Sequence, residues 1–230
     1  METSIIVPAY NEEGNLSELM DNLIAIKLEN YEIIIVNDNS SDKTASIAES
    51  YTRNHKNVSV VHRKEGKNGM GAALKEGTAL ANGKYIIWVM GDNSDDLKLI
   101  PNFIAQLKNN NADMIFGSRY IKDGSYGDME RFKASLSLGY TLIARMLFNI
   151  KVHDITNAFR AFKKDIFTKI TLESDNYAIS PEFAIKSQLM GYKLGEIPTV
   201  YKNRKAGQTK FKFIKMGIDY CKLFKYKLIK

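Results

Sequence analysis

The most chemically suggestive part of the chain is an acidic loop at residues 91–96, which reads Gly-Asp-Asn-Ser-Asp-Asp. Carboxylates crowded into so short a stretch repel one another, and the repulsion raises their pKa values. A divalent cation would relieve it, and Mg²⁺ and Mn²⁺ take oxygen ligands that they commonly share with a diphosphate. We therefore predict a metal site at Asp92 and Asp95. The alternative is that these aspartates only form a turn.

Two further polar segments follow short apolar runs. Residues 8–13 come after the run at 3–7, residues 37–42 come after the run at 31–36, and the acidic loop itself follows the run at 84–90. Ligands of open α/β sheets bind outside the carboxyl ends of the strands. We therefore expect the three segments to meet at one edge of a sheet. Asp42 has a second explanation, because a short carboxylate at this position can cap the following helix.

A glycine-rich segment at residues 66–71 precedes a helical stretch. Amide hydrogens at a helix N-terminus can bind phosphate, which makes Gly71 a candidate contact for a nucleotide. The segment lacks the glycine spacing of a dinucleotide fingerprint and the Lys-Ser/Thr pair of a P-loop. A tight turn where the helix meets the sheet explains the glycines equally well.

Alternating elements must position these segments. Apolar runs rich in β-branched residues occur at residues 3–7, 31–36, 58–61, 84–90 and 112–117, and helical stretches separate them. This alternation predicts an α/β fold with a mostly parallel sheet flanked by helices. The second half continues with a loop at 120–131, a helix at 134–150, a strand at 158–162, a helix at 181–190 and a strand at 194–201.

The composition is that of a globular protein. The chain has 230 residues, of which 44% are hydrophobic and 26% charged, and Cys221 is its single cysteine. One cysteine excludes a disulfide framework and a cysteine-built zinc site. We expect no membrane span and no secretory signal, because no apolar run approaches roughly 18–20 residues and no basic stretch leads an apolar core at the start.

Four motifs carry a resemblance to a known family. They are residues 8–12 (Pro-Ala-Tyr-Asn-Glu), 37–42 (Asn-Asp-Asn-Ser-Ser-Asp), 117–120 (Gly-Ser-Arg-Tyr) and 154–162 (Asp-Ile-Thr-Asn-Ala-Phe-Arg-Ala-Phe). In this order they resemble the family 2 glycosyltransferases and, within them, the dolichyl- or polyprenyl-phosphate sugar synthases. The resemblance covers residues 3–212. It implies a GT-A fold, a nucleotide-sugar donor, a Mg²⁺ or Mn²⁺ cofactor and inverting transfer of a sugar.

The resemblance also implies roles for particular residues. Catalytic roles would fall to Asp92, Arg119 and Arg131. The donor, a UDP- or GDP-sugar, would be bound by Pro8, Ala9, Tyr10, Asn11, Glu12, Asp38, Gly71, Asp92 and Asn93. The acceptor phosphate would be held by Arg119, Arg131, Ser135, Arg160 and Arg204. The chain departs from the family pattern in two places. Asn39 stands where the family often has glycine, although asparagine tolerates the left-handed conformation. Asp92-Asn93 stands where the family usually has Asp-x-Asp, so the metal is assigned to Asp92 and Asp95.

The acceptor decides what chemistry the residues must supply. A sugar hydroxyl would need a carboxylate to take its proton, and Asp154 is the candidate for that base. A lipid phosphate is already an anionic nucleophile, so it needs fixed cations rather than a base, and arginine suits that purpose. A structural role that orients an arginine is the alternative for Asp154, and a surface salt bridge is the alternative for Arg131.

The charge of the chain is concentrated at its end. From residue 201 to 230, ten basic residues face one acidic residue, Asp219, and they alternate with apolar residues. We expect residues 1–210 to form the GT-A domain and residues 211–230 to form a basic amphipathic helix on a membrane surface. The alternative is a helix packed on the body with a solvated basic face.

These observations predict a cytoplasmic enzyme, peripheral on the inner face of the membrane, that transfers a sugar to a polyprenyl phosphate. The first alternative is a glycosyltransferase acting on a glycan or a lipid-linked saccharide. The second is a non-catalytic binder of nucleotide sugars. A nucleic-acid partner is disfavoured, because the body has no basic patch interleaved with aromatic residues.

Overall fold

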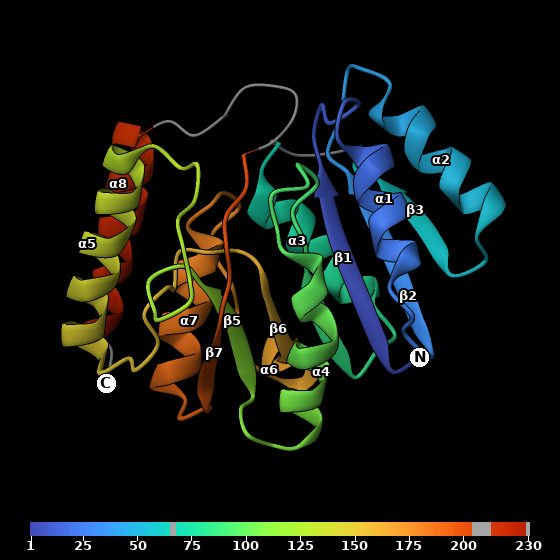
Figure 1. Ribbon diagram of the computed structural model, residues 1–230. Coiled ribbons are helices and arrows are strands. Elements are labelled where there is room, and N and C mark those ends of the chain that lie inside the picture. Colours follow the sequence, from blue (N-terminus) through green and yellow to red (C-terminus); the bar gives the residue numbers. More distant parts are fainter. Residues whose placement is uncertain (65–67, 204–212, 229–230) are drawn as a thin grey trace.

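The computed structural model describes residues 1–64, 68–203 and 213–228. Its centre is a seven-stranded sheet in the order β3-β2-β1-β4-β6-β5-β7 (Figure 1). Strand β6 is antiparallel to both its neighbours, and the other pairs are parallel. The strands are β1 (Thr3–Ala9), β2 (Tyr31–Asn37), β3 (Val58–His62), β4 (Tyr85–Trp88), β5 (Met114–Ser118), β6 (Arg160–Lys163) and β7 (Leu194–Pro198).

Helices cover both faces of this sheet, as the alternating pattern predicts. One face carries α1 (Leu16–Ala25), α2 (Thr44–Asn54), the short 3-10 helix η1 (Leu97–Leu99) and α4 (Ile100–Lys108). The other face carries α3 (Met70–Leu80), α5 (Arg131–Phe148), α6 (Lys164–Lys169), α7 (Ile179–Leu189), α8 (Phe213–Lys222) and the 3-10 helix η2 (Leu223–Lys227). The α/β fold class is therefore confirmed.

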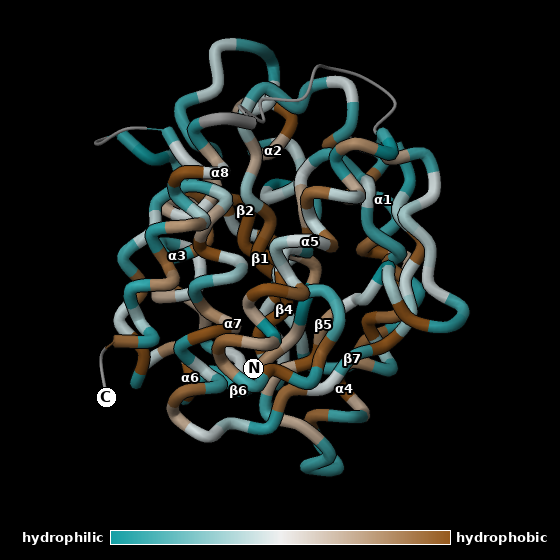
Figure 2. Tube along the Cα trace, turned by 90° about the vertical axis from the view of Figure 1, so that its left-hand side faces the viewer, coloured by the Kyte–Doolittle hydropathy of each residue, from teal (hydrophilic) through white to brown (hydrophobic). Residues whose placement is uncertain are grey.

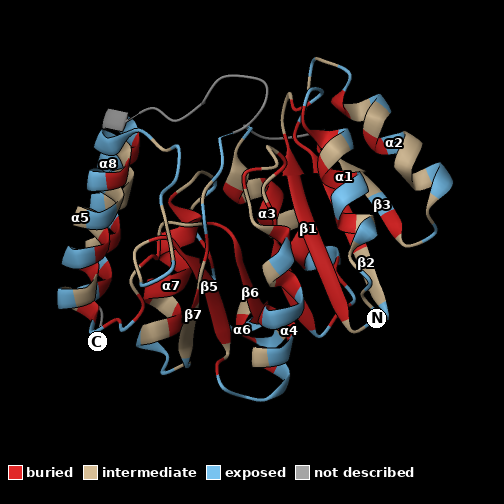
Figure 3. Ribbon diagram, in the orientation of Figure 1, coloured by how far each residue is buried: buried red, intermediate tan, exposed pale blue. Residues whose placement is uncertain are grey.

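Each face of the sheet has its own hydrophobic core, because successive side chains of a strand point to opposite faces. On β1, for example, Ile5 and Val7 pack beneath α1, whereas Ile6 packs beneath α3. All three side chains are fully buried, and Figure 3 shows the central strands in the colour of buried residues. Strands covered on both faces explain why the sequence shows continuous apolar runs instead of alternation.

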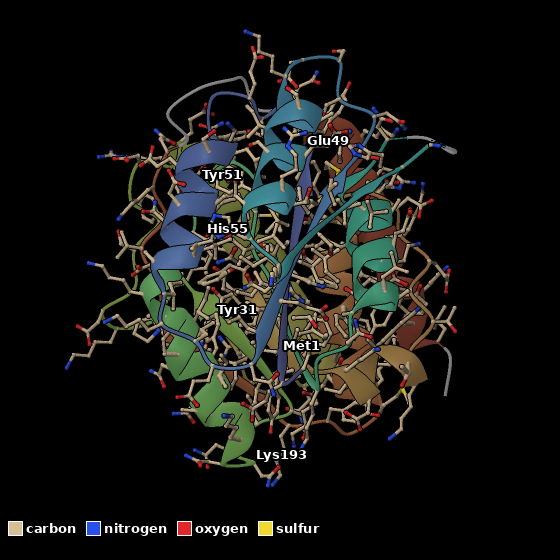
Figure 4. The ribbon with its side chains drawn as sticks, turned by 90° about the vertical axis from the view of Figure 1, so that its right-hand side faces the viewer. Met1, Tyr31, Glu49, Tyr51, His55 and Lys193 are labelled. Carbon is tan, nitrogen blue, oxygen red and sulfur yellow. The ribbon has the colours of Figure 1, made fainter. Side chains whose placement is uncertain are left out.

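The outer helices of the first face are joined by side-chain contacts. Tyr51 on α2 donates from its hydroxyl to the Ser17 carbonyl on α1 at 2.9 Å and to Asp21 Oδ1 at 2.6 Å. Its ring stacks on His55 with 6.0 Å between the centroids, and Figure 4 labels both residues. His55 thus packs against Tyr51 at the end of the same helix.

The C-terminal segment packs on the body. Met216, Leu223 and Tyr226 are buried in the core shared with α5 and α7. On α5, Tyr140 places its ring 4.8 Å from that of Tyr220 and 5.3 Å from that of Phe224. The expectation that the apolar residues of 211–230 face a membrane is therefore wrong for these described residues. Of the tail's described large apolar residues, Ile218 and Leu228 stay exposed.

The contact between α3 and the sheet yields a stability prediction. A Cβ added at Gly77 would lie 2.6 Å from Ile6 Cγ2 and 2.7 Å from Val36 Cγ2, so this helix approaches the sheet as closely as glycine allows. Gly77→Ala should lower the free energy of unfolding in urea by about 1–3 kcal/mol, because the core is overpacked.

Gly139 is the matched control, since it is also helical but has nothing within 4 Å of an added Cβ. Gly139→Ala should raise the free energy of unfolding by about 0.5–1 kcal/mol, because alanine favours the helix. Equal effects of the two substitutions would contradict the close packing of α3.

Candidate functional site

A cleft of about 340 Å³ opens at the carboxyl ends of β1, β2 and β4, which are neighbours in the sheet. These ends lie at the upper edge of the sheet in Figure 1, beside the start of α3. Six residues that the sequence nominated for the nucleotide line the cleft: Pro8, Ala9, Tyr10, Glu12, Asp38 and Asp92. The prediction that the three polar segments meet at one edge is confirmed in the described structure.

Left-handed asparagines shape the three loops at this edge. Asn11, Asn39 and Asn93 have φ of 53°, 57° and 58°. Asparagine tolerates this region of backbone space better than other residues with a side chain, so Asn39 does adopt the conformation that glycine would supply. Asn11 also accepts at Oδ1 from the Ser41 amide at 2.8 Å, which joins the loops after β1 and β2. Asn11 and Asn93 therefore shape the loops and are not among the residues lining the cleft.

Asp38 connects β2 to the start of α3. Its carboxylate pairs with Arg63, and its Oδ2 accepts from the Gly69 amide at 2.6 Å. Arg63 in turn donates from Nε to Glu76 Oε2 at 3.0 Å. Asp38 and Arg63 are both buried, at 3% and 9% exposure, and a buried carboxylate needs such partners. Asp38 still lines the cleft, and this network fixes the orientation of its carboxylate there.

The two aspartates predicted to bind metal are placed differently. Asp92 lines the cleft, and its Oδ1 accepts from the Ser94 amide at 3.2 Å. Asp95 does not line the cleft, and its Oδ2 accepts from the Met90 amide at 2.8 Å. Burial first, and the neighbouring Asp92 charge next, raise the pKa of Asp95 to about 8. The predicted pair is thus divided: Asp92 reaches the cleft and Asp95 holds the loop.

The described residues form no cluster of three or more histidine, cysteine or carboxylate side chains that could hold a metal ion. A divalent ion bound through one carboxylate and the oxygens of a diphosphate fits this arrangement, since Mg²⁺ sites commonly use one or two carboxylates plus substrate phosphates. In such a site Asp92 would be the protein ligand.

A second wall of the cleft comes from a segment that the sequence analysis did not nominate. Asn176 and Tyr177, in the loop before α7, line it together with Lys215 and Met216 of α8. The sequence did point to the neighbouring glycine-rich turn as a possible phosphate site, and its described residues Asn68 and Gly69 line the cleft with Met70, Ala73, Met90 and Gly91.

Gly71 has a packing role here. A Cβ on Gly71 would lie 2.6 Å from the Ser174 carbonyl oxygen and 2.8 Å from that of Asn176. The next residue, Ala72, donates its amide to the Asp175 carbonyl at 3.0 Å. Gly71 lets the start of α3 touch the loop at residues 173–178 and is not among the residues that line the cleft, and its contact with a nucleotide stays a prediction.

The carboxylate of Glu182, on α7, holds this loop in place. Glu182 is fully buried and accepts from the amides of Glu173 and Ser174, both at 2.8 Å. It also accepts from Lys186 Nζ at 2.6 Å and from the Tyr226 hydroxyl at 3.3 Å. Burial alone would raise the pKa of Glu182, but these hydrogen bonds hold it below its ordinary value.

Arg119 forms a buried ion pair with Asp154. Its Nε donates to Asp154 Oδ2 at 2.6 Å and its Nη2 to Oδ1 at 2.9 Å, a bidentate contact. Burial alone would lower the pKa of Arg119, but the Asp154 charge more than offsets this and raises it. Asp154 has 0% exposure and also accepts from Thr156 and Asn157. Its role is therefore to orient Arg119, and it has no access to a substrate hydroxyl.

Three other residues predicted to hold the acceptor phosphate are Arg131, Ser135 and Arg204. Arg131 and Ser135 are exposed in the first turns of α5, and Ser135 donates its hydroxyl to the Arg131 carbonyl at 2.9 Å. Arg119 Nη2 lies 3.4 Å from Ser137 Oγ, so the start of α5 lies beside the Arg119 guanidinium. Arg204 lies outside the described residues.

Arg160 does not fit the predicted role of holding the acceptor phosphate. It is fully buried, and its guanidinium donates to the backbone carbonyls of Ser180, Ile155 and Asn157. It also lies over the ring of Phe116, 4.6 Å from the centroid. Burial lowers its pKa to about 9. These contacts make Arg160 a core residue with no access to a phosphate in this structure.

Solved structures with the same fold place the cleft in context. Glucosyl-3-phosphoglycerate synthase from Mycobacterium tuberculosis in complex with phosphoglyceric acid superposes with a TM-score of 0.73 at 14% identity, covering 99% of this chain and 78% of that one. TarS 1–349 from S. aureus in complex with UDP-GlcNAc gives 0.70 at 17% identity, covering 100% and 67%. The synthase has also been solved with Mn²⁺ and UDP-glucose. The fold is therefore that of the GT-A glycosyltransferases.

The sequence comparisons give the family. The model of "Glycosyl transferase family 2" matches residues 4–171, and the chain belongs to this family. Dolichol-phosphate mannosyltransferase from Pyrococcus furiosus is 30% identical over 216 residues, which are 92% of this chain but 60% of that protein. An uncharacterized protein of Methanocaldococcus jannaschii is 32% identical over 208 residues, covering 87% and 82%. The family resemblance found in the motifs is thus confirmed.

The Arg119–Asp154 pair yields a prediction. Asp154→Asn should lower the free energy of unfolding by about 3 kcal/mol, because it leaves the Arg119 guanidinium buried without its counter-charge. Urea titration monitored by tryptophan fluorescence would measure the change, since Trp88 is buried in the core.

Asp165→Asn is the matched control for this change. Asp165 pairs with Lys169 at 3.3 Å on the exposed surface of α6, so its loss should cost less than about 1 kcal/mol. If both variants lowered the free energy of unfolding by a similar small amount, the buried ion pair would contribute no more to stability than the exposed one.

Proposed function

We propose that the protein transfers a sugar from a nucleotide-sugar donor to a polyprenyl phosphate at a membrane surface, with inversion at the anomeric carbon. The observation that carries this proposal is the position of Arg131. A candidate phosphate-binding arginine is the first residue of α5, the helix whose outer face exposes large apolar side chains to solvent. A lipid phosphate needs these two features together, a cation for its head and an apolar surface for its chain.

The exposed apolar face of α5 consists of six residues. They are Phe132, Leu136, Leu138, Leu142, Ile143 and Met146, with exposures from 37% to 85%. Figure 2 views the molecule from the side that carries α5 and α8. Exposed apolar residues scattered singly are ordinary, but a set gathered on one helix marks an interaction surface.

We propose that this face rests on an anionic lipid surface, because basic residues lie on the same helix and on the segment packed beside it. Lys133 and Arg145 lie on the same helix, and Lys225 and Lys227 lie on the adjacent η2. Basic residues beside an anionic bilayer contribute about 1 kcal/mol each. The described part of the chain has no helix that is both long and apolar enough to cross the bilayer. The proposal moves the membrane contact from the tail to α5.

In the proposed reaction an acceptor phosphate oxygen attacks the anomeric carbon, and the bond from that carbon to the donor's β-phosphate breaks. The acceptor is anionic, so no general base is required, which agrees with the engagement of Asp154 by Arg119. Arg119 and Arg131 would bring the acceptor phosphate close to the donor. Asp92 would hold a divalent cation, which supplies Lewis-acid stabilisation to the departing diphosphate. The nucleoside would lie against Pro8, Tyr10 and Asp38.

The test is transfer of radiolabelled sugar from UDP- and GDP-sugars to a short polyprenyl phosphate, with Mn²⁺. We expect labelled lipid without any added sugar acceptor. Asp92→Asn should lower the rate by roughly 100-fold, since charge on the leaving group is no longer stabilised. Transfer that requires an added glycan would identify the alternative acceptor class, and nucleotide binding without transfer to either would identify a non-catalytic binder.

Arg131→Ala should reduce the kcat/KM for the polyprenyl phosphate by roughly 10–100-fold, the effect of one charge-assisted hydrogen bond to phosphate. Binding of UDP or GDP, measured by calorimetry, should be unchanged. Arg53→Ala is the control, because Arg53 is exposed on the distant α2. Parallel loss of nucleotide binding would place Arg131 in the donor site instead.

The apolar face of α5 yields a flotation prediction. The double variant Leu136→Glu, Ile143→Glu should bind vesicles of phosphatidylcholine and phosphatidylglycerol at least about tenfold more weakly than the unmodified protein, because two apolar side chains leave the lipid. Leu189→Glu on α7 is the control, since Leu189 has the same 49% exposure as Ile143 but lies outside this face. Undiminished flotation of the double variant would rule out α5 as the contact.

A further inference from the structure

The cleft has an uneven distribution of charge. Its described lining contains the carboxylates of Glu12, Asp38 and Asp92, and Lys215 is the one cation among those described lining residues. Asp38 has Arg63 as a counter-charge behind the wall, and Glu12 accepts from the neutral amide of Asn15 at 2.8 Å. A nucleotide sugar would add the negative charge of its diphosphate to this acidic lining. Bringing anions together requires cations that are already in place.

The position of Lys215 is determined by the packing of α8. The next residue, Met216, is 4% exposed and lines the cleft itself. One turn further on, Asp219 Oδ2 accepts from Asn176 Nδ2 at 2.9 Å, which joins α8 to the loop of the second wall. Tyr140 on α5 donates its hydroxyl to the Tyr220 carbonyl at 3.2 Å. Three neighbouring contacts thus hold the backbone of this turn at the cleft.

The ammonium group of Lys215 is available to a ligand. The nearest carboxylate on its own helix, Asp219, uses Oδ1 for Lys222 at 2.8 Å and Oδ2 for Asn176. Across the described residues 1–64, 68–203 and 213–228, no hydrogen bond or ion pair engages Lys215 Nζ. Its flexible four-carbon stem allows the charge to follow a phosphate oxygen over several ångströms.

We propose that Lys215 is a donor-binding residue that contacts the diphosphate of the nucleotide sugar, opposite the loop that carries Asp92. The inference rests on the proposed function, because it takes the ligand of the cleft to be a nucleotide sugar. Nothing in the motifs of residues 8–162 marks this lysine, which reaches the cleft only because the C-terminal segment folds back onto the body. The basic tail thereby supplies one charge to the donor site in addition to any charge it presents to lipid.

The test compares calorimetric binding of UDP, GDP, UMP and GMP, each with Mn²⁺, to the full chain and three variants. Lys215→Gln should raise the Kd of the diphosphate that the unmodified protein prefers by about tenfold, since one phosphate contact is lost. The Kd of the matching monophosphate should change less than about twofold, because that ligand lacks the β-phosphate. Lys215→Arg should retain most of the affinity, because it keeps the charge.

Lys56→Gln is the control, since Lys56 is exposed before β3, and it should bind like the unmodified protein. The melting temperature of Lys215→Gln without ligand should also be unchanged. Equal diphosphate affinity in Lys215→Gln and the unmodified protein would overturn the assignment and leave the proposed function intact. Equal weakening of monophosphate and diphosphate would also overturn it. If the unmodified protein binds neither UDP nor GDP, the proposed function fails and this inference fails with it.

Discussion

The buried carboxylate of Glu182 joins its own helix α7, the loop that precedes this helix and the distant C-terminal segment. It accepts from the amides of the loop at residues 173–178, from Lys186 on its own helix, and from Tyr226 in the C-terminal segment. The loop it holds is the surface against which Gly71 and the start of α3 pack, and it carries Asn176 and Tyr177 to the cleft. A fully buried carboxylate is stable in its charged form only when hydrogen bonds and a counter-charge offset the loss of its hydration. Glu182 therefore links the loop of the second wall to the C-terminal segment, which is packed in the same hydrophobic core.

The sheet and the first wall of the cleft could be predicted from sequence because their signals are local. Apolar runs that end in polar turns mark strands, and the carboxyl ends of parallel strands share one edge. The only surprise within the sheet is β6, which lies antiparallel between β4 and β5. A run such as residues 158–162 reveals that a strand exists, but its direction depends on the long connection before it.

The second wall could not be predicted, because it depends on contacts between distant segments. Lys215 resembles any other lysine of a basic tail until Met216, Leu223 and Tyr226 bury themselves in the core. The same limit explains Arg160, which has the right residue type for a phosphate ligand but lies among backbone carbonyls. Asp92 and Asp95 are also indistinguishable in sequence, and the fold separates their roles by placing Asp92 in the cleft wall and Asp95 on the Met90 amide. Residue type indicates chemistry, whereas access to a ligand is decided by tertiary packing.

Because α8 belongs both to the hydrophobic core and to the wall of the cleft, occupancy of the cleft and fraying of the chain's last helix are thermodynamically linked. A ligand that touches Lys215 or Met216 binds more tightly to molecules in which α8 is docked, so it must suppress local unfolding of that helix by the same factor that local unfolding weakens binding. Amide hydrogen exchange along α8 would then slow when the cleft is filled, even at residues that no ligand touches. The C-terminal helix is in this sense a reporter of cleft occupancy built into the fold.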